Sequence, residues 1–158
     1  NGGILRNKTN LFKAFWKAHV AAAAAGNHLT SYPIVRMPRG PGIHNVSHLL
    51  GELMLDDAID VEEPREAYDS FEFRLLRDDA YADVLSEEDR EAIAVGVQYI
   101  SDKTAVEASE NSHRDSRSWN AARDGEELDI NLDAMSDDEL NRLRKRFSKT
   151  VAALNTTS

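Results

Sequence analysis

Two histidines and one glutamate share a face of a predicted helix and could bind a metal ion there. His44, His48 and Glu52 are spaced four residues apart in a helix predicted over residues 43–57. Imidazole and carboxylate groups are both zinc ligands. The His-Glu-x-x-His motif of metalloproteases is absent, however, and a solvated polar face explains the same spacing. We therefore predict no metal site and keep a metal-dependent hydrolase as the least favoured hypothesis.

Other catalytic patterns are missing or incomplete. His113-Arg114-Asp115 looks like a kinase catalytic loop, but no glycine-rich loop, strand lysine or Asp-Phe-Gly accompanies it. The chain contains no cysteine, which excludes thiolate zinc sites, iron–sulfur clusters and cysteine nucleophiles. It also lacks the Gly-x-Ser-x-Gly elbow and the glycine-rich phosphate loops. We therefore predict that the chain is not an enzyme and has no catalytic residue and no cofactor.

The length and composition are typical of one soluble domain. The chain has 158 residues, of which 41% are hydrophobic. No apolar stretch is long enough to span a membrane, and no secretory signal is recognisable. Together with the absence of cysteine, this predicts a cytoplasmic protein with no membrane partner.

Charge is distributed unevenly along the chain. Residues 1–51 hold six basic and no acidic residues, residues 52–91 hold sixteen acidic and four basic residues, and the whole chain has a net charge of −9. Nucleic acid is an unlikely partner for such a chain, because binding needs a basic face that displaces counterions. The acidic segment 52–91 could attract a basic protein, although a solvated surface that keeps the chain soluble explains it as well.

Apolar periodicity predicts a mainly helical chain. A largely buried helix is expected over residues 10–25, with Lys13 and Lys17 outside its apolar face. Thr9 or Asn10 can cap its start, and Gly26 can end it. Further helices are predicted over residues 43–57, from Ser86, from Thr104 to about residue 112, at 119–123 and from Ser136.

Three segments are predicted to be strands. They are residues 32–37, 59–61 and 68–76, and the last alternates apolar and polar side chains with the period of a half-buried strand. Residues 38–42 contain two prolines and two glycines and are predicted to form a turn, and residues 62–66 a hairpin loop. The predicted fold class is α+β: a mainly helical single domain with a small antiparallel β-sheet, in which the helices starting near Asn10 and Ser86 are the most buried.

The predicted C-terminal helix is amphipathic. Its acidic residues lie at the start and its basic residues follow, as the helix dipole favours. Helices of this kind usually bury their apolar face against their own domain, so we expect intramolecular packing. The alternative is that the face lies in a partner's groove. The apolar stripe consists of Leu140, Leu143, Phe147, Val151 and Leu154.

Three short segments together resemble a known family. The first is the aromatic-rich start of the first helix, and the others are residues 29–41 and 112–128. In order and spacing they resemble the Panacea domain, also called the SocA-like antitoxin domain, over roughly residues 10–130. Ser31 and Gly42 depart from the family pattern. The matching residues are Leu11, Phe12, Lys13, Phe15, Trp16, Thr30, Tyr32, Gly40, Pro41, Ser112, His113, Trp119, Ala122, Gly125 and Glu126.

The resemblance divides the chain into two parts. Residues 1–130 form the Panacea-like domain, and residues 131–158 are a C-terminal amphipathic helical extension of the same domain. We expect the motif residues to be structural: Gly40 and Pro41 would set a turn, Trp119 would fill the core, and His113 would form hydrogen bonds beside it.

The resemblance implies a bacterial or prophage antitoxin that neutralises a co-encoded toxin by direct protein–protein interaction. The cognate toxin would then be the partner. One alternative is a proteolytic adaptor that delivers a partner to a protease. Another is a DNA-binding regulator that uses the basic residues 1–51. The remaining one is the metal-dependent hydrolase built on His44, His48 and Glu52.

Overall fold

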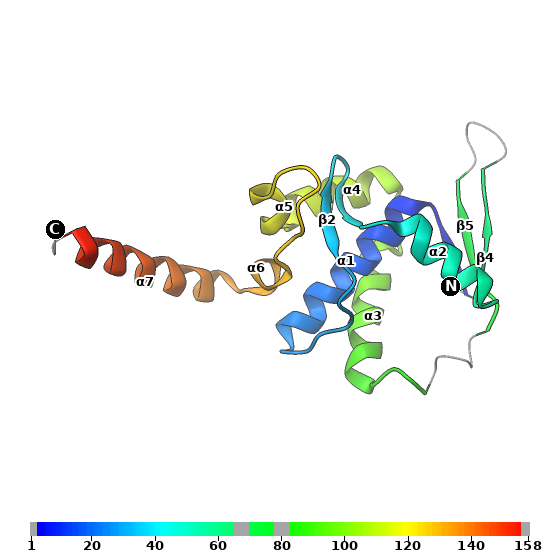
Figure 1. The fold of residues 1–158 in the computed structure, drawn as a ribbon, viewed down its shortest axis with the longest axis horizontal. Coiled ribbons are helices and arrows are strands. Elements are labelled where there is room, and N and C mark those ends of the chain that lie inside the picture. The colour runs from blue at the N-terminus through cyan, green and yellow to red at the C-terminus, as the bar shows by residue number, and fades with distance from the viewer. Residues whose placement is uncertain (1–2, 65–69, 78–82, 156–158) are drawn as a thin grey trace.

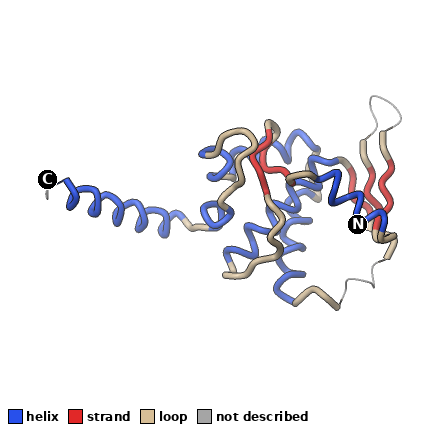
Figure 2. Tube along the Cα trace, in the orientation of Figure 1, coloured by secondary structure: helices blue, strands red, loops and turns tan. Residues whose placement is uncertain are grey.

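The computed structural model describes residues 3–64, 70–77 and 83–155, and within them it has the expected α+β fold (Figures 1 and 2). The helices are α1 (Lys8–Ala24), α2 (Val46–Leu55), α3 (Glu87–Ile100), α4 (Ala105–Asp115), α5 (Arg117–Ala121), α6 (Ile130–Ala134) and α7 (Asp137–Asn155). The strands are β1 (Ile4–Arg6), β2 (Ile34–Met37), β3 (Gly40–Ile43), β4 (Ile59–Glu62) and β5 (Glu72–Leu75). Helix α1 is central and packs against α3, α4, α6 and β3.

The small antiparallel sheet is present, but one of its predicted strands was wrong. Its order is β1-β5-β4, so the central strand β5 pairs with β4 as expected and with β1, which we did not predict. Strand β2, expected in this sheet, pairs with β3 in a separate hairpin. Residues 65–69 of the predicted loop and strand lie outside the described residues.

The prediction of a turn over residues 38–42 was only partly right. Pro38 and Arg39 form the turn, whereas Gly40 and Pro41 begin strand β3, in which Ile43 pairs with Ile34. A two-stranded hairpin tolerates proline, because half of the backbone groups on each of its strands face away from the ladder. Because Ile43 belongs to β3, helix α2 begins three residues later than predicted.

The packing of α1 against α3 depends on small side chains. A Cβ atom on Gly96 of α3 would lie 2.3 Å from the backbone oxygen of Ala14 and 3.0 Å from the Cβ of Ala18. The two helices therefore approach until their backbones nearly touch. Among the helices, these two contain the most buried residues, seven in α1 and three in α3, as we predicted.

The cap residues follow the predictions in part. Gly26 ends α1 with a φ of 77°, and Ser86 and Asp89 form a capping box at the start of α3, both as expected. The predicted cap of α1 was wrong: the side chain of Asn7, rather than Thr9 or Asn10, accepts a hydrogen bond from the Asn10 backbone at 2.7 Å.

Helix α7 projects away from the rest of the molecule, as Figure 1 shows at the left. Phe147, on its apolar stripe, remains 65% exposed. The expected intramolecular packing was therefore wrong for Phe147, whereas Leu140 and Leu143 are partly buried and the side chains of Val151 and Leu154 lie outside the described part of the chain. The direction of α7 is set at its base, where the Arg117 guanidinium forms an ion pair with Asp137 and donates to the backbone oxygen of Met135.

No helix in the described part of the chain is both long and apolar enough to cross a membrane.

Candidate functional site

The three candidate metal ligands are not brought together. His44 lies before the start of α2, so it is not on the same helical face as His48 and Glu52. His48 Nδ1 lies 3.5 Å from Glu52 Oε2, and both side chains are well exposed. Within residues 3–64, 70–77 and 83–155, no group of three or more histidines and carboxylates is placed to hold a metal ion.

The segments that carry the family resemblance do meet, at the β2–β3 hairpin. Lys13 of α1 donates from Nζ to the backbone oxygen of Pro41 at 2.8 Å. Trp119 of α5 donates from Nε1 to the backbone oxygen of Met37 at 2.9 Å. These hydrogen bonds fix strand β3 to α1, and they fix Met37, the last residue before the turn, to α5.

The side chains of His113 and Arg36 both lie against the ring of Trp119. The His113 ring is stacked on it with a centroid distance of 4.1 Å and an interplanar angle of 7°. The Arg36 guanidinium lies 4.4 Å from its ring centre and also forms an ion pair with Asp124. Burial and the positive charge of nearby Lys13 lower the pKa of His113.

Glycine is required where the hairpin meets α4. Gly40 has a φ of 98°, a conformation that L side chains rarely adopt. A Cβ atom there would lie 2.5 Å from Ser112 Oγ and 2.7 Å from Lys13 Nζ. The Gly-Pro pair therefore allows close contact between the hairpin, α1 and α4, which is more than the turn that we predicted.

Lys13 is the clearest error of the sequence analysis at this site. We placed it outside the buried face of α1, but it is 1% exposed. The wide apolar face of the helix continues around Lys13 because β3 covers that side. Burial lowers the pKa of Lys13 to about 7.

Burial of Lys13 predicts a specific pH dependence of stability. Between pH 7 and 10.5 the unfolded chain binds a proton at Lys13 that the folded chain does not, so the unfolding free energy rises with pH in this window. The slope that Lys13 contributes is at most ~1.4 kcal/mol per pH unit. We expect Lys13→Met to remove this rise in urea unfolding measured from pH 6 to 10. An identical slope in both proteins would contradict the burial of a titrating amine.

A second polar cluster, which sequence reasoning missed, anchors α6. Trp16 Nε1 and the hydroxyls of Ser116 and Ser118 donate to Asp133 Oδ2 at 2.9, 2.8 and 2.7 Å, and the Ser118 backbone donates to Oδ1 at 2.7 Å. Asp133 thereby fixes α6 to α1 and α5. This cluster positions the base of α7. Nothing in the spacing of these residues in the sequence signals the contact.

Most buried polar side chains at these two clusters form hydrogen bonds within the chain, whereas His113 Nε2 has no hydrogen-bond partner among the described residues. Lys13 donates to Pro41, Trp119 to Met37 and Trp16 to Asp133, so each of these side chains is used to hold a helix or the hairpin in place. The arrangement is typical of a scaffold. Among the exposed groups, those of α7 and of the acidic surface near α2 are considered below as binding surfaces.

Comparisons of this chain with protein-family models, with curated proteins and with solved structures return no match.

Proposed function

We propose that this chain is an antitoxin-like binding protein that neutralises a co-encoded toxin by direct contact, with α7 as the principal binding element. The observation that carries the proposal is the exposed apolar stripe of α7. Leu140 and Leu143 are partly exposed and Phe147 is 65% exposed, on a helix that extends away from the domain.

The physical argument is that a helix of a folded protein gains most of its stability by packing an apolar face rather than from its intrinsic propensity. Helix α7 has 19 residues and a capped start, where Ser136 and Glu139 exchange hydrogen bonds, but Phe147 on its apolar face is 65% exposed and no described helix or strand packs extensively on it. A protein partner with an apolar groove would supply that packing.

The two clusters around Lys13 and Asp133 support a binding role. They fix the scaffold from which α7 extends, because Lys13 and Trp119 donate hydrogen bonds to the hairpin and Trp16 donates one to Asp133 of α6. The resemblance of residues 10–130 to the antitoxin family points to the same class of function. Delivery of a partner to a protease would use the same kind of contact and is the alternative within this class.

The test is co-expression of the chain with the product of the adjacent reading frame, scored by cell growth. Wild-type chain is expected to restore growth. Leu143→Asp with Phe147→Asp is expected to abolish rescue, because two carboxylates on the stripe would have to be buried in the interface. Both positions lie on the projecting helix, so the domain should remain folded.

The matched control is Asn141→Asp with Ser148→Asp, which adds the same charge to other faces of α7. It should retain rescue. Full rescue by the Leu143 and Phe147 double variant, with the protein present at wild-type levels, would show that the stripe is not the binding surface.

A further inference from the structure

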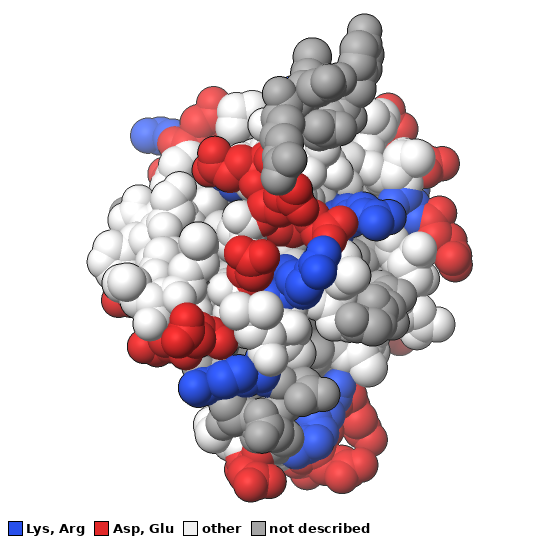
Figure 3. Space-filling model, turned by 90° about the vertical axis from the view of Figure 1, so that its right-hand side faces the viewer, with Lys and Arg blue, Asp and Glu red and all other residues white. Residues whose placement is uncertain are grey.

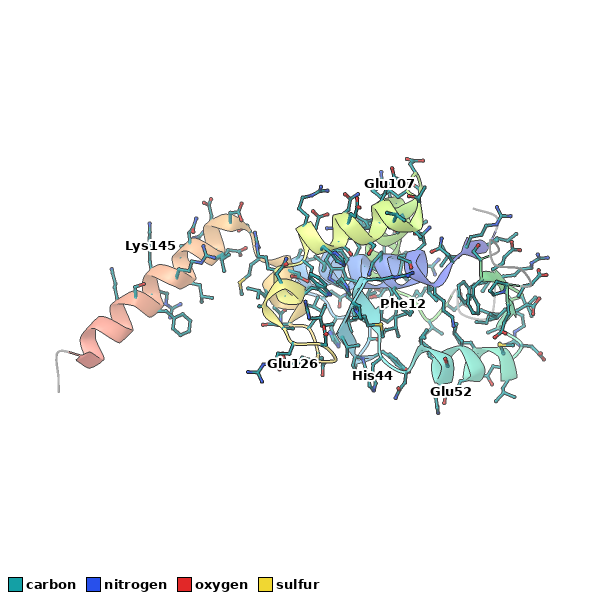
Figure 4. All side chains as sticks on the ribbon, turned by 90° about the horizontal axis from the view of Figure 1, so that it is seen from above. Phe12, His44, Glu52, Glu107, Glu126 and Lys145 are labelled. Atoms are coloured by element: carbon teal, nitrogen blue, oxygen red, sulfur yellow. The ribbon has the colours of Figure 1, made fainter. Side chains whose placement is uncertain are left out.

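The two ends of the molecule carry surfaces of opposite charge. Residues 140–149 of α7 contain five basic and no acidic residues. Residues 52–63, at the end of α2 and in β4, contain six acidic and no basic residues. Figure 4 shows that they are far apart, with Lys145 on α7 at one end and Glu52 on α2 near the other. Helix α7 therefore cannot reach this acidic surface of its own chain without leaving its position.

Exposed apolar side chains accompany the acidic residues. Leu55, at the end of α2, is 86% exposed, and Met54 beside it is 44% exposed. Leu76 is 52% exposed, and its backbone donates to the oxygen of Ala58 at 2.9 Å, which places it beside the end of α2. We call this surface the α2 patch; it consists of Glu52, Met54, Leu55, Asp56, Asp57 and Leu76.

The charge of the α2 patch is largely uncompensated. Glu52 has His48 at 3.5 Å, and no ion pair is formed by Asp56 or Asp57 within the part of the chain that the structure describes. Two cations of the adjoining sheet, Arg6 and Arg74, both pair with Glu72, and Arg74 also attracts Asp60 and Glu62 of β4. Figure 3 views the molecule from this end and shows acidic side chains, with some basic ones beside them, next to uncharged surface.

Helix α7 and the α2 patch are complementary in two respects. The helix presents apolar side chains flanked by basic ones, and the patch presents apolar side chains flanked by acidic ones. We propose that α7 of one copy packs on the α2 patch of a second copy, and that the second copy returns the same contact. The free protein is then a two-fold symmetric dimer in which the apolar stripe of each α7 is covered.

The small area of a single contact between α7 and the α2 patch favours a dimer in which the contact is made twice. One helix on one small patch buries less than the ~1,200–2,000 Å² of a stable interface, whereas a two-fold pair makes the contact twice. Because the two surfaces lie at opposite ends of an elongated molecule, two chains lying antiparallel bring both contacts into register. The inference concerns the protein without its partner and does not depend on the identity of a toxin.

The test is sedimentation velocity of the purified full chain and of two charge-reversal variants. Arg144→Glu with Arg146→Glu reverses the two charges that flank the stripe on α7, and Glu52→Lys with Asp56→Lys reverses two charges of the patch. Wild type is expected to dimerise, with a dissociation constant that rises ~10-fold or more at high salt, because exposed charges are then screened. Each variant alone is expected to be monomeric, because in both contacts the two introduced charges face side chains of the same sign.

Mixing the two variants in equal amounts provides the decisive result. In a mixed pair, the reversed helix meets the reversed patch and the native helix meets the native patch, so a dimer is expected to form again. Formation of that dimer also shows that both variants are folded. The matched control is Glu88→Lys with Glu91→Lys, which makes the same change in charge on exposed positions of α3 and should dimerise like wild type.

Several results would overturn the proposal. They are a wild-type chain that stays monomeric at all concentrations, a reversed variant that dimerises by itself like wild type, and a mixture that stays monomeric although both variants melt like wild type. Association of wild type into open chains would contradict the closed pair.

Discussion

Gly96→Ala is expected to destabilise the protein by ~3 kcal/mol, at the upper end of the cost of overpacking a core. The added methyl carbon would stand 2.3 Å from the backbone oxygen of Ala14. A backbone atom in the middle of α1 cannot rotate away as the end of a side chain could. The helices α1 and α3 must therefore separate, and every contact between them is weakened.

The control for this prediction is Gly51→Ala in α2. A Cβ atom at Gly51 would meet nothing within 4 Å, and alanine favours a helix by ~0.5–1 kcal/mol over glycine. Urea unfolding of both variants is therefore expected to give changes of opposite sign. Equal stability of Gly96→Ala and wild type would show that α1 and α3 do not approach as closely as the structure has them.

Trp16→Ala is expected to cost ~3–5 kcal/mol, the usual cost of removing a large aromatic side chain from a core. Trp16 is 0% exposed and packs with Val20, Ile34 and Leu128. Since small domains have a total stability of ~5–15 kcal/mol, this change alone is expected to leave a substantial unfolded population.

Trp16→Phe separates the two roles of this side chain. Phenylalanine keeps an aromatic ring in the core but removes the Nε1 donor, so Asp133 loses one of its hydrogen bonds. A loss of ~1–3 kcal/mol is expected for a partly buried acceptor deprived of one donor. Urea unfolding measures both variants, and the ranking wild type, Trp16→Phe, Trp16→Ala is the expected order of stability. A Trp16→Phe variant as unstable as Trp16→Ala would contradict this division.

The elements with local sequence signals could be predicted. Ser86, Thr104 and Ser136 each precede an acid three residues later, and all three cap helices in the structure. The alternation in residues 68–76 indicated a strand, and β5 occupies part of that range. These signals depend on neighbouring residues only, so a single sequence carries them.

The features that depend on distant contacts could not be predicted. Strand β1 has three residues and becomes a strand only because β5 lies beside it. Lys13 is buried by a hairpin that is 28 residues away along the chain. The Asp133 cluster joins side chains up to 117 residues apart, which no periodicity reveals.

At the candidate binding site too, the local features could be predicted from the sequence and the long-range ones could not. The pattern of α7 predicted its apolar stripe correctly, but whether the stripe is covered depends on tertiary contacts. The general tendency of amphipathic helices to pack on their own domain gave the wrong expectation here. The acidic character of residues 52–63 is plain in the sequence, whereas its distance from α7 required the structure.

The most direct test of the proposed function is calorimetric titration of the adjacent reading frame's purified product with this chain. Wild type is expected to bind stoichiometrically, and Leu143→Asp with Phe147→Asp is expected to lose measurable binding while still unfolding in urea in one cooperative transition. Binding of equal affinity by both proteins, or no heat of binding with wild type, would contradict the account in which α7 carries the contact with the partner.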